Sequence, residues 1–165
     1  MWYLIFILIG MFALYFFWPH LASLFNFYVS NYYNRQTVYS LIIITSVSLF
    51  IYWYSQKIID LDFGNRILHS LGGGLVAYLV GVLSVVDKKI SISRLSFFVL
   101  SLLLISTLGV VNEIVEYILQ NCFHLLNAAE TINDTWLDLI SNTFGILLGA
   151  ILFTPLISNR KKTVL

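Results

Sequence analysis

Several residues that could do chemistry lie inside apolar segments of this sequence, where ionisable side chains are rare and usually functional. The set is His69, Glu113, Glu116, Asp134 and Asp138. Carboxylates suit a hard divalent cation such as Mg, Mn or Ca, and an added imidazole suits Zn. A metal-bound water could attack a phosphate or ester, and a carboxylate pair without metal could do acid–base work.

Within each segment the polar residues share one helical face with small residues, because positions three or four apart are neighbours on a helix. Three sets follow this spacing: His69, Gly73, Ala77 and Gly81; Ser106, Gly109, Glu113, Glu116 and Gln120; and Asp134, Asp138, Asn142, Gly145 and Gly149. Small residues mark close packing between membrane helices. The carboxylates are therefore expected to face the bundle interior.

These faces define the candidate residues of a polar pocket. His69, Glu113, Glu116 and Asp138 are the candidate catalytic residues and also the candidate metal ligands. Arg66, Asn112, Asp134 and Asn142 are the candidate binding residues. The alternative is polar packing, in which the carboxylates and His69 only hydrogen-bond to neighbours, and Asp134 is an N-cap. The Gly145/Gly149 and Gly73/Ala77 pairs could also form a homo-oligomer contact.

Composition places the chain among membrane proteins. It has 165 residues, of which 59% are hydrophobic and 10% charged, whereas soluble domains are about 25% charged. The net charge of +1 gives no basic surface for nucleic acid. A single cysteine, Cys122, excludes an internal disulfide and is expected to be a small apolar filler.

The sequence predicts an all-α, polytopic transmembrane helix bundle in one domain, residues 1–165. About 20 apolar residues are needed to span a bilayer, and five stretches qualify: 2–18, 38–54, 66–86, 95–119 and 135–157. The first is expected to end at Pro19 and lacks the basic region and cleavage site of a signal peptide. Residues 20–36 are expected to lie in the interface as a short helix. Aromatic residues at the ends of the runs, Trp18 among them, are expected to be interface anchors.

Basic residues predict the orientation, since they concentrate on the cytoplasmic side. Residues 87–94 and 160–162 each contain three Lys or Arg, whereas residues 120–134 contain none. We therefore expect a multi-pass protein of the prokaryotic plasma membrane with the N-terminus outside and the C-terminus in the cytoplasm. The ionisable residues of the three polar faces then lie near the outer surface. The charges near the cytoplasmic surface are expected to be ordinary loop residues.

Three motifs resemble a known family. "ILHSLGGGLVAY", "NEIVEYILQ" and "DTWLDLISNTFGILLGA" are similar to motifs of the VanZ-like and YjdF-like bacterial membrane proteins. The resemblance covers roughly residues 62–152, and Glu116 with the "DTWLD" start leans toward the YjdF-like side. It implies a helical membrane protein of the cell envelope with its polar residues at matching positions, and it does not specify an activity.

Three functions follow from these observations. The first is a membrane protein whose extracytoplasmic pocket binds a lipid headgroup, an envelope precursor or a divalent cation. The second is a metal-assisted hydrolase acting within the membrane on a lipid-linked phosphate or ester. The third is a proton or ion pathway, which the absence of ionisable residues deeper in the cytoplasmic half disfavours.

Overall fold

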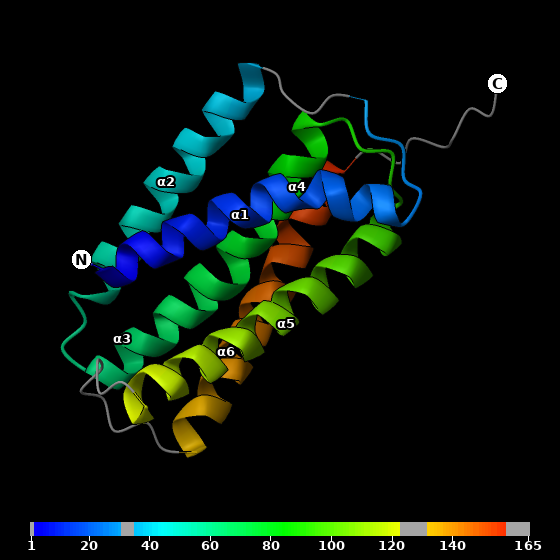
Figure 1. Ribbon diagram of the computed structural model, residues 1–165. Coiled ribbons are helices and arrows are strands. Elements are labelled where there is room, and N and C mark those ends of the chain that lie inside the picture. Colours follow the sequence, from blue (N-terminus) through cyan, green and yellow to red (C-terminus); the bar gives the residue numbers. More distant parts are fainter. Residues whose placement is uncertain (1, 31–34, 123–131, 158–165) are drawn as a thin grey trace.

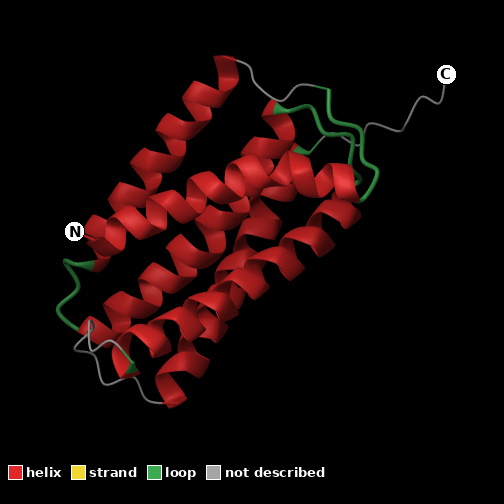
Figure 2. Cartoon of the chain, in the orientation of Figure 1, coloured by secondary structure: helices red, strands yellow, loops and turns green. Residues whose placement is uncertain are grey.

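The computed structural model describes residues 2–30, 35–122 and 132–157, and nearly all of these are helical (Figure 2). The elements are α1 (Trp2–Leu24), α2 (Arg35–Ser55), α3 (Leu61–Ile67), the π-helix η1 (Leu68–Val76), α4 (Ala77–Asp87), α5 (Arg94–Asn121), α6 (Ile132–Phe153) and the short 3-10 helix η2 (Thr154–Leu156). They form five helical segments long and apolar enough to cross a membrane. The predicted all-α transmembrane bundle is confirmed.

The predicted spans are correct in number and differ at their ends. The third runs from Leu61 to Asp87, because α3, η1 and α4 follow one another without a break. The expected interfacial helix is wrong for the described residues. His20 lies inside α1, and Tyr28 forms an isolated antiparallel bridge with Ser91.

The third span is the centre of the bundle. Buried residues make up 61% of it, against 17–33% of the other four spans. In Figure 1, α2 lies on one side of this segment and α5 on the other, and α1 crosses in front of it. Helices around it expose apolar side chains, as lipid-facing helices do. The third span is therefore the segment around which the other helices pack.

The most extensive helix contact is between η1 and α6, and glycines let the two helices approach closely. A Cβ on Gly74 would stand 2.7 Å from the Cα of Gly145, and a Cβ on Gly145 would overlap the carbonyl oxygen of Ser70. Gly149 packs against the Tyr78 ring, and Ala77 is buried. The small residues expected to mediate a homo-oligomer are therefore taken up by contacts inside the chain. A second copy would have to use another surface.

Pro19 does not end α1, contrary to the prediction from sequence, because the helix continues to Leu24. A proline inside a helix has no N–H for the carbonyl four residues earlier, which here belongs to Tyr15. The Ser84 hydroxyl of α4 donates to that carbonyl oxygen at 2.7 Å. Serine side chains satisfy freed backbone groups in this way in membrane helices. The proline is thus tolerated because the neighbouring helix supplies the missing donor.

Replacing Ser84 by alanine should lower the free energy of unfolding by about 1–3 kcal/mol, since it leaves the buried Tyr15 carbonyl without this donor. Pro19→Ala restores an N–H four residues beyond that carbonyl. We therefore expect Ser84→Ala to cost less in a Pro19→Ala background. The measurement is a double-mutant cycle of unfolding in detergent. Equal costs in the two backgrounds would show that Ser84 does not act through the proline.

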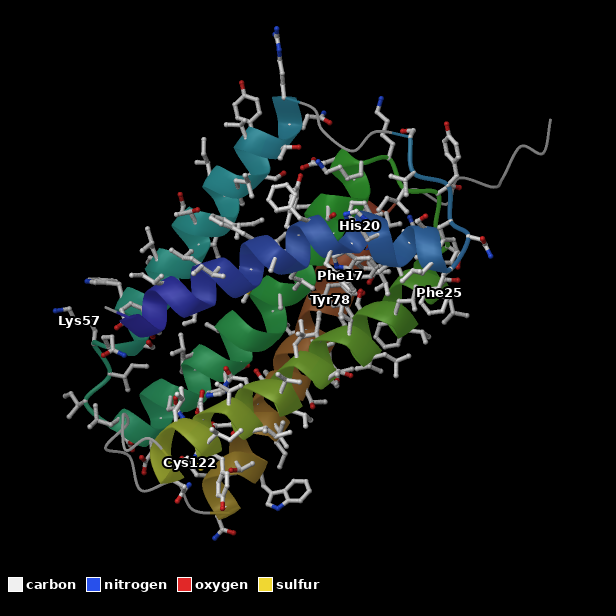
Figure 3. The ribbon with its side chains drawn as sticks, viewed as in Figure 1. Phe17, His20, Phe25, Lys57, Tyr78 and Cys122 are labelled. Carbon is white, nitrogen blue, oxygen red and sulfur yellow. The ribbon has the colours of Figure 1, made fainter. Side chains whose placement is uncertain are left out.

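Trp18 is not an interface anchor, contrary to expectation. It is fully buried, and its ring stacks on Phe97 with the centroids 5.0 Å apart. Phe97 in turn meets Tyr78, which lies among the helices in Figure 3. A Cβ on Gly81 would lie 2.6 Å from the indole nitrogen of Trp18, so the glycine makes room for the ring.

Cys122 was expected to be a small apolar filler, but it is exposed just after the end of α5.

Candidate functional site

Three helices bring one ionisable side chain each to a common point. His69 comes from η1, Glu113 from α5 and Asp138 from α6. One nitrogen or oxygen of each lies within 4.8 Å of those of the other two. All three are buried, with relative exposures of 5%, 5% and 1%. The four-residue spacing of small and polar residues therefore did predict which faces meet.

The two nitrogens of His69 face different carboxylates. Nε2 lies 3.4 Å from Oδ2 of Asp138, and Nδ1 lies 3.9 Å from Oε1 of Glu113. Ligand atoms around a tetrahedral zinc are roughly 3.3 Å apart, because Zn–N and Zn–O bonds are about 2.0–2.2 Å long. A histidine gives only one nitrogen to an ion, and the three donor atoms lie within 4.8 Å of one another, which is farther apart than a metal would hold them. Side-chain rotations would have to bring them closer to complete a site.

The π-helix places His69. A π-helix has i→i+5 hydrogen bonds and holds more residues per turn than an α-helix, and such turns are frequent at functional sites. His69 and Gly73 lie four residues apart within η1, and Ala77 follows four residues later at the start of α4, so the three lie on roughly one side of this segment. This face is the one that packs on α6. No sequence signal predicted the π-helix, although the Gly72–Gly74 run marks its middle.

Asp138 is held by a second group of polar residues, which lie at the end of α3 and the start of α6. The Arg66 guanidinium forms ion pairs with Asp138 and Asp134, each with an N–O distance of 2.5 Å. Asn65 donates through Nδ2 to Oδ2 of Asp138 at 3.1 Å. Asn65 was not among the sequence candidates, although it directly precedes Arg66. Arg66 thus fixes one oxygen of Asp138 and leaves the other beside Asn65 and His69.

The charges at this end of the bundle do not balance within the group. When Glu113, Asp134 and Asp138 are ionised, they outnumber Arg66 by two charges, and a neutral His69 adds none. Uncompensated charge in a low-dielectric interior is strongly unfavourable. A divalent cation would carry the compensating charge, and this donor set fits one. Two carboxylates and an imidazole with no thiolate are ligands of zinc and manganese.

Other candidates lie apart from the three. Asn112 donates through Nδ2 to Oε1 of Glu116 at 2.6 Å along the exposed side of α5. Neither belongs to the group of donor atoms within 4.8 Å. Asp134 is not an N-cap, because α6 already begins at Ile132 and the Asp134 carboxylate is turned to Arg66. Asn142 does reach the site, 3.4 Å from His69 through Nδ2. His124 lies outside the described residues.

The opposite end of the bundle holds a second buried polar group, contrary to the expectation of ordinary loop charges. The Tyr15 hydroxyl donates to Oδ2 of Asp87 at 2.6 Å. Lys88 is fully buried, donates to the Thr37 hydroxyl at 2.8 Å and lies 5.3 Å from the centre of the Tyr15 ring. Burial lowers the pKa of Lys88, and the neighbouring Asp87 carboxylate opposes this. These contacts join α1, α2 and the end of α4. Because the residues lie far apart in the sequence, the sequence alone did not predict the contacts.

One protein-family model matches nearly all of the chain. A model described as "Predicted membrane protein (DUF2238)" matches residues 1–159. The chain belongs to this family. No curated protein and no solved structure matches the DUF2238 chain. Family membership and the five apolar helices together establish a membrane protein. They do not extend to the VanZ-like or YjdF-like resemblance.

Proposed function

We propose that this membrane protein binds a divalent transition-metal ion, of the zinc or manganese class, through His69, Glu113 and Asp138. The observation that carries the proposal is the meeting of three buried donor side chains from three helices within 4.8 Å. The surplus of two carboxylates over Arg66 supports it, because a divalent cation compensates that charge.

The closed surroundings favour a cation over a lipid headgroup or an envelope precursor. His69, Glu113 and Asp138 are each at most 5% exposed. The structure does have an apolar groove of about 290 Å³, but residues of α2 line it: Val38, Leu41, Ile42, Thr45 and Ser46. None of these belongs to the helices that supply the three donors. A large ligand would therefore need the helices to separate, whereas an ion would not.

The ligand count favours a second candidate function, metal-assisted hydrolysis within the membrane. Structural zinc sites have four protein ligands, whereas catalytic ones have three and keep a position for water or substrate. Here three donors converge. A water activated there could attack a lipid-linked phosphate or ester. Such an enzyme would also need its lipid substrate to reach the ion past α5 or α6.

The charge distribution supports an outward-facing site in a plasma membrane. The site lies at the end of the bundle where α3 and α6 begin, since Arg66 of α3 contacts Asp134 of α6. The other end includes Arg94, which donates to the carbonyl of Ile157 beyond η2. The basic residues of 87–94 thus lie opposite the site. With positive residues inside, the ion would be bound from the extracytoplasmic side.

Glu113→Gln should abolish zinc-dependent stabilisation of the purified protein, because it removes an anionic ligand and keeps the side-chain size. We expect zinc at 100 times its Kd to stabilise the wild-type protein by about 2.7 kcal/mol and to raise its Tm accordingly. The measurement is a thermal melt in detergent after chelator treatment, with zinc, manganese or calcium added. Glu116→Gln on the same helix is the matched control and should keep the shift.

If none of the three metals changes the melting temperature of the wild-type protein, the proposal of metal binding is contradicted. Loss of the shift in Glu116→Gln but not in Glu113→Gln would place the ion elsewhere on α5. If zinc binds, release of phosphate or fatty acid from bilayer lipids, measured with and without the ion, tests the hydrolase candidate. Turnover that disappears with Asp138→Asn is the expected result for that candidate.

A further inference from the structure

Asn142 of α6 is the polar neighbour of His69 that the metal-binding role leaves unexplained. Its side chain is 5% exposed, and Nδ2 lies 3.4 Å from Nδ1 of His69. Its other end, Oδ1, is buried and has no hydrogen-bond partner among the described residues. A buried amide oxygen without a partner is costly and calls for an explanation. The Nδ2 end of the amide therefore contacts His69, and the Oδ1 end makes no hydrogen bond with the described residues.

Two glycines form the slot that holds this amide. A Cβ on Gly73 of η1 would overlap Oδ1, and a Cβ on Gly109 of α5 would stand 3.3 Å from Nδ2. The three helices thus approach the amide with no side chain between them. The oxygen and the NH₂ group of an asparagine are nearly the same size, so the slot accepts the amide in either orientation. The orientation is then decided by hydrogen bonding to His69.

The chemistry of a metal-bound histidine requires a partner at this position. A neutral imidazole gives one nitrogen to the metal and carries its proton on the other. Nε2 is the nitrogen beside Asp138, at 3.4 Å, so it is the one placed to share an ion with that carboxylate. The proton then lies on Nδ1, where an acceptor orients the ring and makes the ligand more basic. Nδ2 of Asn142 lies 3.4 Å from Nδ1, closer than Oε1 of Glu113 at 3.9 Å.

We propose that Asn142 is a positioning residue that selects the tautomer of His69 by the direction of its amide. Without metal, Nδ2 donates to Nδ1, and the ring proton is on Nε2 facing Asp138. With metal on Nε2, the single ring proton is on Nδ1, and the amide turns so that Oδ1 accepts it. The amide direction and the tautomer therefore change together. This inference rests on the proposed metal-binding function.

The test is nitrogen NMR of the purified protein with ¹⁵N-labelled histidine at pH 8, since the two tautomers give different ¹⁵N shifts. His69→Gln identifies the His69 signals among the three histidines. We expect an Nε2–H ring without metal and an Nδ1–H ring with zinc. Asn142→Leu should abolish the metal-free preference and weaken zinc binding about 10–100-fold. Asn112→Leu, on the exposed side of α5, is the matched control and should change neither.

Gly109→Ala provides a second variant if Asn142→Leu does not fold, because its methyl group would crowd Nδ2 and displace the same amide. An Nδ1–H ring in the metal-free wild-type protein would overturn the inference. So would an unchanged tautomer and zinc affinity in the Asn142 or Gly109 variant. If zinc does not bind at all, the proposed function fails. The metal-free tautomers of wild type and variant still decide whether Asn142 controls the ring.

Discussion

Replacing Gly145 by alanine is expected to prevent α6 from packing on η1. The new methyl group would overlap the carbonyl oxygen of Ser70 and lie 2.9 Å from the backbone nitrogen of Leu75. Backbone atoms cannot turn aside as a flexible side chain can, so the two helices would have to separate. Overpacking typically costs about 1–3 kcal/mol and occasionally more. We expect more than about 3 kcal/mol here, seen as loss of the single folded species in size-exclusion chromatography.

Gly10→Ala is the control for this substitution. Gly10 also lies within a helix, and a Cβ there would meet nothing within 4 Å. Alanine should be neutral or stabilising at that position, since it is the better helix former by about 1 kcal/mol in a helix interior. Indistinguishable melting temperatures for the Gly145 and Gly10 variants would show that η1 and α6 are not packed as closely as described.

Arg66→Met should destabilise the protein by about 3–5 kcal/mol, the usual cost of breaking a buried ion pair by removing one partner. It leaves Asp138, which is 1% exposed, without its cation. Asp134 is 28% exposed and reaches water, so most of the cost should come from Asp138. The measurement is the free energy of unfolding in detergent without added metal.

Two further variants isolate the ion pair from a general loss of positive charge. Lys57→Met removes an exposed cation from the loop between α2 and α3 (Figure 3), and we expect little change. Asp138→Asn in the Arg66→Met background should recover part of the lost stability, since no unpaired charge remains. An Arg66→Met protein as stable as Lys57→Met would mean that the pairing does not hold the helices together.

The sequence was enough to predict the helices and the faces that carry the site. Their number follows from the length of the apolar runs, and the spacing of His69, Glu113 and Asp138 with small residues indicated which sides meet. That prediction works because a membrane helix can bury polar groups only against another helix. Contacts made by residues three or four apart are local and therefore readable from one sequence.

The features that sequence analysis missed depend on pairs far apart in the chain. Pro19 predicted a helix end, but the Ser84 hydroxyl, 69 residues from Tyr15, satisfies the carbonyl that the proline frees. Lys88 was predicted to be an ordinary loop cation, but it is buried and donates to the hydroxyl of Thr37 in α2. The π-helix η1 has no local signature either. Each of these is set by tertiary packing, which local preferences do not contain.

The contact between Arg66 and its two aspartates has a consequence for how the protein is made. Asp134 follows Arg66 by 68 residues and Asp138 by 72. At about 5–20 residues per second, synthesis delivers these partners roughly 3–14 s after the arginine. Until α6 has been synthesised, the Arg66 guanidinium has neither of these two carboxylates as its partner. The helix α6 supplies both partners of Arg66, so the site forms only after α6 has been synthesised and has packed against the third span.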